Sequence, residues 1–293
     1  MKVANIGHRA HLVEGALCFD IAQASDGRFP ADPQAVFARW QEISDWAAGS
    51  SLGNGRPYRA SELLPPVPRP RQIFAVGLNY LEHAAEARVD PPREPMVFTK
   101  FVTSLTGPRG TIALPSAAVD WEVELVVVIG RAAWQIEAED GWKYVVGLTI
   151  GQDLSDRARQ FADSQPQFSL SKSYPGFSPI GPYVADVSEV PDPDDLAIEC
   201  SVNGEVMQRD RTASMLFSVG EIMARLSRIL PLLEGDILFT GTPSGVAIGR
   251  TPQRYLRAGD RLASRIEGLG EMLHDMTGAA TAAREHRTPQ GRN

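Results

Sequence analysis

Short apolar segments rich in Val, Ile and Leu alternate with turns along most of this chain. Segments of this length, bounded by Gly, Pro, Asn or Asp, are typical of β-strands. Asn203-Gly204 lies between two of them and favours a tight β-hairpin turn. The strands predicted in this way span residues 73–76, 96–99, 122–129, 145–150, 197–202, 237–240 and 262–266.

Helical periodicity is confined to a few places. Apolar residues recur every three or four positions over 218–229, which predicts an amphipathic helix there, and a weaker helical signal covers 81–88. Strands and hairpin turns with interspersed short helices indicate an α+β or mainly β fold rather than alternating βαβ units.

The first part of the chain differs in pattern from the rest. Residues 1–65 are predicted to form a small N-terminal α+β domain. Within it, Asp32-Pro33 has the capping Asp and the first-position proline of a helix start, so a helix is predicted from there. The proline-rich stretch 63–70 is typical of a semi-rigid linker. We expect the main domain at 66–276 and a polar C-terminal tail at 277–293, where the periodicity is lost.

Composition limits the classes of partner. With 43% apolar and 22% charged residues, the 293-residue chain has the make-up of an ordinary globular protein with a sizeable core. The net charge of -7 disfavours a nucleic-acid partner, and an anionic substrate therefore needs a local cationic site. No segment has the roughly 18 consecutive apolar residues of a membrane span, so no membrane partner is expected.

The N-terminal residues and the cysteines bear on the compartment. The chain begins without the continuous apolar segment of a signal peptide. Cys18 and Cys200 are the only cysteines, too few for a disulfide framework or a thiolate metal site. We therefore expect a reducing, cytoplasmic location.

Two glutamates interrupt the most apolar predicted strand. Side chains alternate between the two faces of a strand, so Glu122 and Glu124 share one face, about 6–7 Å apart along the backbone. The rest of the strand is apolar on both faces, which indicates burial on both. Buried carboxylates this close repel each other unless a cation lies between them, and their hard oxygen atoms suit a divalent metal ion. The spacing alone equally allows a solvated strand end, with both glutamates paired with Arg or Lys.

A third carboxylate follows a neighbouring predicted strand. Asp153 comes just after residues 145–150 and would complete a set of oxygen donors with Glu122 and Glu124. Alternatively, Asp153 caps a short helix. In both cases Arg157 and Gln160 follow on one helical face.

His83 and Glu86 are three residues apart in the weaker predicted helix, where side chains at this spacing are neighbours. The carboxylate can orient the imidazole and raise its basicity, which suits a base that activates water at neutral pH. A surface pair without a catalytic role has the same spacing.

Lys100 ends a predicted strand, and Lys172 lies between glycine and proline residues. Either can meet a substrate carboxylate or enolate, although most lysines face water. The Gly-rich turn that begins at Thr240 can present backbone N–H groups to an anion. It lacks the Gly-Lys-Ser/Thr ending of a phosphate loop, which disfavours nucleotide binding.

Taken together, these segments closely resemble the fumarylacetoacetate hydrolase family over residues 70–275. Each motif is weak by itself, whereas their joint order is highly specific. The matching motifs are Gly77-Leu78-Asn79-Tyr80 with His83 and Glu86, Phe98-Thr99-Lys100, Asp120-Trp121-Glu122-Val123-Glu124-Leu125, Asp153 with Arg157 and Gln160, Lys172, Gly181-Pro182, Val202-Asn203-Gly204-Glu205, and Thr240-Gly241-Thr242-Pro243-Ser244-Gly245-Val246.

The resemblance implies a mixed β-sandwich roll and a homodimer. It also implies a site for Mg²⁺, or Mn²⁺, built from Glu122, Glu124 and Asp153. It places His83 and Glu86 on a segment that orders over the bound substrate. The positions that match residues holding substrate or catalytic water are Arg157, Gln160, Lys172 and Thr240.

For the activity, the resemblance implies a small anionic oxo acid with a second carbonyl group, in the breakdown of aromatic compounds. We expect a metal-dependent hydrolase that cleaves a carbon–carbon bond of an acylpyruvate or fumarylpyruvate, with His83 activating water and Lys172 stabilising the enolate. Decarboxylation of oxaloacetate-like acids and isomerisation of 2-hydroxy-dienoates are alternatives on the same scaffold. A non-catalytic small-molecule binding module is the alternative from another class.

Some features set this chain apart from the family pattern. Asp156-Arg157-Ala158 departs from the common order of a small residue, Arg and Asp, and Gln152 replaces the usual Asn. The loop 161–170 has no counterpart and is expected to shape specificity. The aromatic residues that indicate an apolar pocket are Trp121, Phe161, Phe168, Tyr174 and Phe177.

Overall fold

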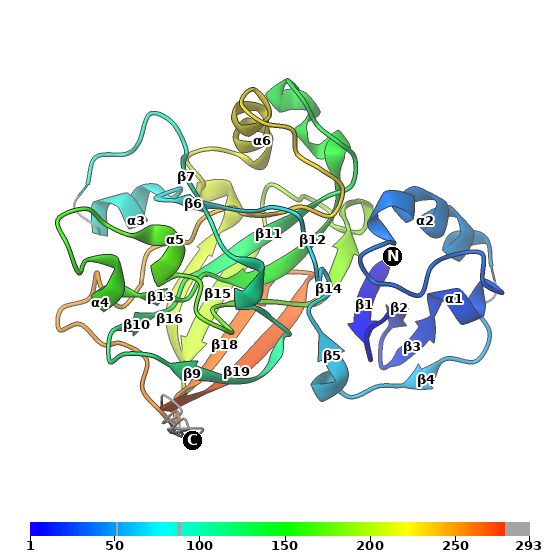
Figure 1. The fold of residues 1–293 in the computed structure, drawn as a ribbon, viewed down its shortest axis with the longest axis horizontal. Coiled ribbons are helices and arrows are strands. Elements are labelled where there is room, and N and C mark those ends of the chain that lie inside the picture. The colour runs from blue at the N-terminus through cyan, green and yellow to red at the C-terminus, as the bar shows by residue number, and fades with distance from the viewer. Residues whose placement is uncertain (51, 87–88, 279–293) are drawn as a thin grey trace, which may run out of the picture.

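The computed structural model describes residues 1–50, 52–86 and 89–278, and two β-sheets form most of it (Figure 1). In the described part of the chain, the larger sheet has 12 strands. Ten of them follow the order β4 (Arg56–Pro57), β3 (Leu17–Asp20), β2 (Arg9–Glu14), β1 (Lys2–Ile6), β14 (Ser178–Asp186), β12 (Val145–Gln152), β11 (Val123–Ile129), β17 (Ile237–Phe239), β6 (Ile73–Gly77) and β7 (Met96–Thr99). In addition, β5 (Leu63–Leu64) pairs with β1, and β8 (Leu105–Thr106) pairs with β14.

The smaller sheet packs on the larger one, and short helices surround both. Its strands are, in order, β16 (Glu205–Arg211), β15 (Ala197–Val202), β18 (Arg261–Ile266), β19 (Gly270–Gly278) and β9 (Arg109–Leu114). A separate two-stranded ladder joins β10 (Val119–Asp120) and β13 (Ser155–Asp156). The α-helices are α1 (Ile21–Ala24), α2 (Trp40–Gly49), α3 (Leu81–Glu86), α4 (Arg157–Gln160), α5 (Phe168–Ser171) and α6 (Val219–Ser227). Among the described residues, none of these helices is long and apolar enough to cross a membrane.

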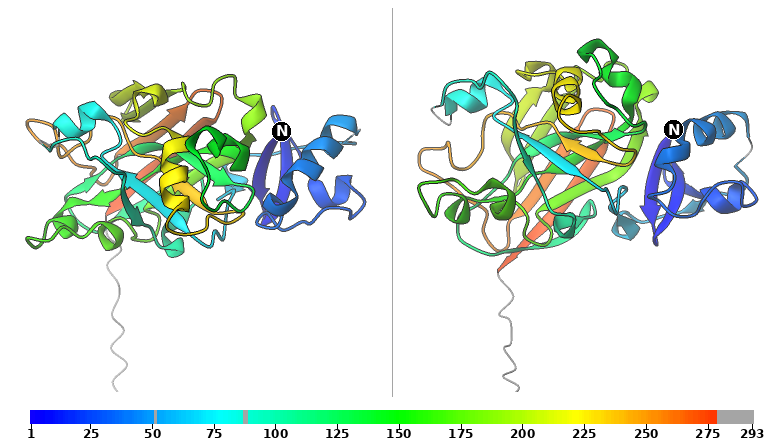
Figure 2. Two further views of the ribbon diagram at one scale, coloured as in Figure 1. Left: turned by 90° about the horizontal axis from the view of Figure 1, so that it is seen from above. Right: turned by 45° about the horizontal axis from the view of Figure 1, so that its top comes forward.

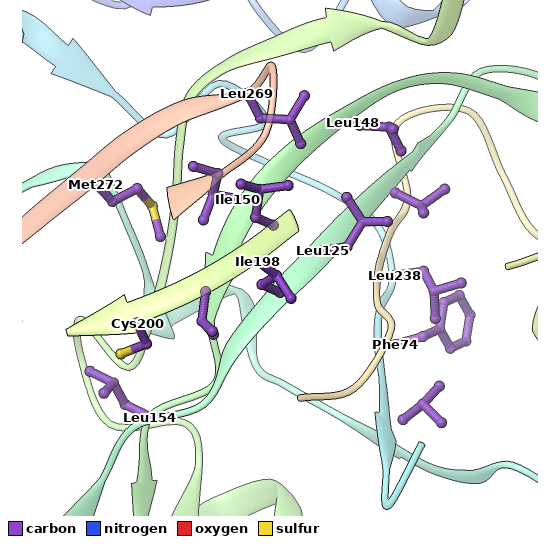
Figure 3. Packing of buried hydrophobic residues seen from close by; sticks show 14 of the residues in the cluster. Phe74, Leu125, Leu148, Ile150, Leu154, Ile198, Cys200, Leu238, Leu269 and Met272 are labelled. Carbon is purple, nitrogen blue, oxygen red and sulfur yellow. The ribbon is translucent and has the colours of Figure 1, made fainter. Parts of the chain in front are cut away.

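The core of the sandwich lies where β11 and β12 contact β15 and β18. Figure 3 shows Leu125 and Ile150 of the larger sheet packed with Ile198 and Met272 of the smaller one. Every residue of β11 is buried, Glu124 included, as the apolar residues on both faces of this strand predict. Both parallel and antiparallel pairs occur, because β17 runs parallel to β6 and antiparallel to β11. Mixed sheets with few helices confirm the predicted mainly β sandwich.

The N-terminal strands continue the larger sheet. Figure 2 shows the N-terminal elements gathered at one end of the molecule. There β1 pairs antiparallel with β14, and the Trp40 indole N–H donates to the Asp186 carboxylate at 2.7 Å. Val3, Ile21 and Phe37 share a buried cluster with residues of the main sheets. The domain boundaries at 65 and 276 stay a prediction.

The pattern-based elements agree with the structure in most places. All seven predicted strands are present, with end shifts of at most two residues. The helix at 218–229 is α6, which begins after Ser218 with a capping box. The helix at 81–88 is α3 as far as Glu86, and residues 87 and 88 lie outside the described ones.

The helix predicted from Asp32-Pro33 is wrong. The chain forms turns there, and α2 starts only at Trp40. The Asp32 carboxylate accepts the Gln34 N–H and pairs with Arg69, so it caps a turn instead of a helix. At the other end, β19 extends through Thr277 to Gly278, and residues 279–293 lie outside the described part.

Candidate active site

Three carboxylates meet at the ends of two neighbouring central strands of the larger sheet. Glu122 directly precedes β11, Glu124 is the second residue of β11, and Asp153 directly follows the paired strand β12. The Asp153 N–H donates to the Glu122 carbonyl at 2.9 Å, which fixes the two segments together. One oxygen from each carboxylate lies within 4.8 Å of the others, and all three residues are buried. The alternative that Asp153 caps a helix is not realised, because Asp156 caps α4.

Basic side chains surround this acidic triad, Glu122, Glu124 and Asp153. The Lys172 ammonium lies 2.6 Å from Glu122 Oε2 and 2.7 Å from Asp153 Oδ2. Lys100 donates to the other Asp153 oxygen. The glutamates are therefore not at a solvated strand end, although Glu122 does have the basic partners that this alternative proposed.

Arg157 binds the opposite side of Glu122. Its guanidinium pairs with Glu122 and with Asp120, whose Oδ2 is 2.9 Å from Arg157 Nε. It also donates to the Gln160 side-chain oxygen at 2.8 Å. Arg157 and Gln160 thus face one another from the two ends of α4. The buried ion pairs hold the guanidinium in one orientation.

The two glutamates have opposite electrostatic environments. Burial disfavours the charged form of Glu122. The positive charges of Lys172 and Arg157 have a larger effect in the opposite direction and lower the pKa of Glu122 to about 2. Burial and the neighbouring Asp153 and Glu122 raise the pKa of Glu124 well above its ordinary value. Glu124 accepts the Gly241 N–H at 2.7 Å and forms no ion pair with the described residues.

The triad fits a divalent metal ion. All three donors are hard carboxylate oxygens, as Mg²⁺ and Mn²⁺ prefer. Glu124 is buried beside two other carboxylates and has no ion pair among the described residues, and a bound cation would supply the missing partner. Glu122, Glu124 and Asp153 are therefore the residues that could hold the metal.

A cavity of about 850 Å³ opens beside the triad and contains the predicted base. His83 lies on α3, and its Nδ1 is 3.5 Å from Glu86 Oε2, as the three-residue spacing predicts. The predicted site residues that line this cavity are His83, Glu86, Glu122, Glu124, Arg157, Gln160 and Lys172.

The other predicted site residues lie behind the cavity lining. Lys100 is buried and donates to Asp153 and to the Lys172 carbonyl, so it contacts the triad rather than open space. The Thr240 hydroxyl donates to the Leu125 carbonyl at 3.0 Å, and its neighbour Thr242 lines the cavity instead. Contact of Lys100 or Thr240 with substrate stays a prediction.

Aromatic side chains form one wall of the cavity. Phe98 and Phe168 lie with their ring centroids 5.6 Å apart, and Phe161 lines the same space. Phe161 and Phe168 belong to the loop 161–170 that has no counterpart in the family pattern. The other aromatic residues expected there are packed elsewhere: Trp121 is buried in the core, and Tyr174 and Phe177 pack on each other.

Sequence reasoning missed the residues that hold the site together. Asp120 is the second partner of Arg157, and its carboxylate also accepts the N–H groups of Ala247 and Ile248. Gly245 donates its N–H to the Glu86 carboxylate. Asp120 opens the sequence motif that contains Glu122, but nothing in that motif indicates its pairing with Arg157, and the contacts of Gly245 have no local signature either.

Comparison with known proteins gives concordant results. The sequence model of the fumarylacetoacetate (FAA) hydrolase C-terminal region matches residues 72–277. The chain is 42% identical to the mitochondrial oxaloacetate tautomerase FAHD2A of Bos taurus over 213 residues, which is 72% of this chain and 68% of the relative.

Solved structures resemble the whole fold. A Mycobacterium smegmatis crystal structure, proposed to be an HpcE protein, has a TM-score of 0.91 and 46% identity, and the match covers 96% of this chain and 100% of that one. The maleylpyruvate hydrolase of Sphingobium sp. SYK-6, solved with manganese (II) ion and pyruvate, has a TM-score of 0.79 and 25% identity, covering 96% and 100%.

Proposed function

The chain belongs to the fumarylacetoacetate hydrolase family of enzymes, and we propose that it hydrolyses a carbon–carbon bond in a small β-diketo acid. The substrate would be of the acylpyruvate or fumarylpyruvate type, and the products a 2-oxo acid and a carboxylic acid. The manganese-bound relative and the buried triad Glu122, Glu124 and Asp153 support a divalent metal cofactor.

The observation that carries this proposal is the aromatic-walled cavity next to the triad. Its volume of about 850 Å³ is far more than a four-carbon acid fills. Phe98, Phe161 and Phe168 offer apolar surface that suits an acyl chain or ring. The 2-oxo acid end would lie at the triad and Lys172, and the acyl end along the aromatic wall.

The reaction uses the residues of this chain in a fixed order. When bound, the metal ion supplies Lewis acidity toward the oxygen atoms of the oxo acid. His83, oriented by Glu86, takes a proton from a water molecule that attacks the distal carbonyl carbon. The bond from that carbon to the central carbon then breaks, and its electron pair forms the enolate of the 2-oxo acid.

Lys172 stabilises the negative charge of this enolate, because its ammonium already bridges Glu122 and Asp153 at the cavity floor. The proton held by His83 is then returned to the central carbon, which regenerates the base and releases the 2-oxo acid. Arg157 pairs with Glu122 and Lys100 pairs with Asp153, and these ion pairs hold the two carboxylates in place.

Keto–enol tautomerisation of oxaloacetate is a second candidate. It is favoured by the 42% identity to a protein of that name. This reaction moves a proton between carbon and oxygen without attack by water, so it needs a base and a stabilised enolate but no acyl pocket. Decarboxylation of oxaloacetate-like acids would use the same enolate.

His83→Ala tests the role of His83 as the base in hydrolysis. We expect the variant to lose acylpyruvate hydrolysis by about 100-fold or more, because general-base catalysis is worth about 10²–10⁴-fold. The measurement is pyruvate release, with products identified by mass. Full hydrolysis by the variant would contradict the proposal, and wild-type protein that only interconverts oxaloacetate tautomers would replace it with the second candidate.

We further propose Mg²⁺ as the resident ion, with Mn²⁺ as a substitute, since carboxylate oxygens accept both. We propose a homodimer because the family resemblance implies one, and a reducing, cytoplasmic location because the chain has only two cysteines. Sedimentation equilibrium at micromolar concentration tests the dimer.

A further inference from the structure

We propose that Gly249 is a positioning residue for the catalytic pair His83 and Glu86, because the Glu86 side chain occupies the space that any side chain on residue 249 would need. This inference rests on the proposed function, in which Glu86 orients the base. A β-carbon placed on Gly249 would lie 2.1 Å from Glu86 Cγ, 2.2 Å from Cδ and 2.5 Å from Oε1. Atoms that are not bonded do not approach so closely, so the Glu86 side chain would have to move.

Glu86 has little freedom to move without losing its contacts. Its carboxylate is 3.5 Å from His83 Nδ1 on one side. On the other side it accepts the Gly245 N–H, with both oxygens at 3.1–3.2 Å from the nitrogen. The Ser244 hydroxyl reaches Glu82 of the same helix at 3.3 Å. The segment 244–249 therefore forms a platform on which α3 and its two functional side chains are docked.

Asp120 and Trp121 hold the platform in place by hydrogen bonds. The Asp120 carboxylate accepts the Ala247 N–H at 2.6 Å and the Ile248 N–H at 3.2 Å. The Trp121 indole donates to the Gly245 carbonyl at 3.2 Å. Because these hydrogen bonds, one of them fully buried, fix the loop, a methyl group on residue 249 would displace the flexible Glu86 side chain rather than the loop.

Residue 249 is a glycine because a side chain has no room there, and not because the backbone conformation requires one. Gly249 is not among the residues with a positive φ, so alanine can adopt its backbone conformation. Gly249→Ala should therefore leave the fold nearly unchanged while moving one carboxylate in the cavity. Gly49 is a matched control, since it also lacks a positive φ, is exposed at the end of α2, and a β-carbon there meets nothing within 4 Å.

The test compares Gly249→Ala with Gly49→Ala in acylpyruvate hydrolysis. We expect Gly249→Ala to lower kcat by about 10- to 100-fold, part of what a general base provides, with KM changed by less than about 2-fold. Gly49→Ala should match the wild type. In a Glu86→Ala background, adding Gly249→Ala should change kcat by less than about 2-fold, because the group to be displaced is gone. Effects of the two substitutions that multiply would overturn the proposal.

Amide exchange of Gly245 provides a readout that needs no turnover. Its N–H is protected by the Glu86 carboxylate, so Gly249→Ala should speed its exchange and Gly49→Ala should not. Unchanged exchange in Gly249→Ala would refute the positioning role. If the wild type cleaves no acylpyruvate, the proposed function fails, and this exchange measurement still decides the role of Gly249.

Discussion

Replacing Glu124 with glutamine should stabilise the metal-free protein and remove most of the stabilisation that a bound metal ion gives the wild type. Glutamine keeps the shape of the side chain and an oxygen that accepts the Gly241 N–H, but it removes the charge. Glu124 is buried, has no ion pair among the described residues, and lies within 4.8 Å of two other carboxylates. Metal-free protein should therefore become more stable.

The size of the effect follows from this geometry. At an effective dielectric constant of about 20, two charges separated by 4.8 Å repel by roughly 3 kcal/mol. Proton uptake by Glu124, whose pKa is raised, relieves part of this repulsion. We expect Glu124→Gln to raise the free energy of unfolding by about 1–3 kcal/mol in chelator, or roughly 2–8 °C in melting temperature.

A bound metal ion should stabilise the wild type much more than the variant. At a metal concentration of about 100 times Kd, the wild type should gain about 2.7 kcal/mol, whereas the variant, which lacks one of three ligands, should gain little. The assay is thermal unfolding in chelator and over a titration with Mg²⁺ or Mn²⁺. Equal responses of both proteins to metal, or a less stable variant in chelator, would refute this reasoning.

Glu122→Gln is the matched control. It makes the same substitution in the same triad, but it should lower the free energy of unfolding in chelator, whereas Glu124→Gln should raise it. Glu122 pairs with Lys172 and Arg157, so its neutralisation removes one of the two carboxylate partners of each of these buried cations and leaves only Asp153 and Asp120. Breaking a buried pair of this kind costs about 3–5 kcal/mol, and this variant should be less stable than the wild type even in chelator.

Three further predictions concern the pocket, the N-terminal strands and the response to acid. Phe168→Ala should raise KM about 10-fold for acylpyruvates with long or aromatic acyl groups and leave KM for acetylpyruvate nearly unaffected, because the lost apolar contact is worth about 1.5–3 kcal/mol. An equal change of KM for all substrates would contradict the placement of the acyl group along the aromatic wall. Trp40→Phe should lower the free energy of unfolding by about 1–2 kcal/mol in urea denaturation, since buried Asp186 loses a hydrogen-bond donor, and no loss would show that this link is unimportant. Burial lowers the pKa of His274 from 6.5 to about 4, so the unfolded chain binds more protons between these values and stability should fall by up to about 3 kcal/mol as the pH drops through this window. In His274→Gln this pH slope should flatten, and an unchanged slope would assign it to other groups.

The sequence predicted the elements in which local pattern and burial agree. β11 is apolar except for Glu124, and α6 combines helical periodicity with a capping Ser218, so both were found. β14 was missed because Pro179, Gly181 and Pro182 argue against a strand. Its place in the sheet comes from pairing with β1, β8 and β12, which are far away in sequence.

The same distinction holds in the site. Alternation along one strand placed Glu122 and Glu124 together, and helical spacing placed His83 beside Glu86. The ion pair of Arg157 with Asp120 joins residues 37 positions apart, and its geometry depends on how several loops pack. The room that Gly249 leaves for Glu86 is likewise a tertiary property, so no local pattern could reveal it.

The central claim is metal-dependent cleavage of an acylpyruvate, and its most direct test is the loss of enol absorbance from a panel of acylpyruvates. Each substrate is incubated with Mg²⁺, with Mn²⁺ and with chelator, and the products are identified by mass. The account predicts that pyruvate and the matching carboxylic acid form only with metal, faster for acyl groups that reach the Phe98 and Phe168 wall. No cleavage with either metal, while oxaloacetate tautomers interconvert or release carbon dioxide under the same conditions, would contradict it.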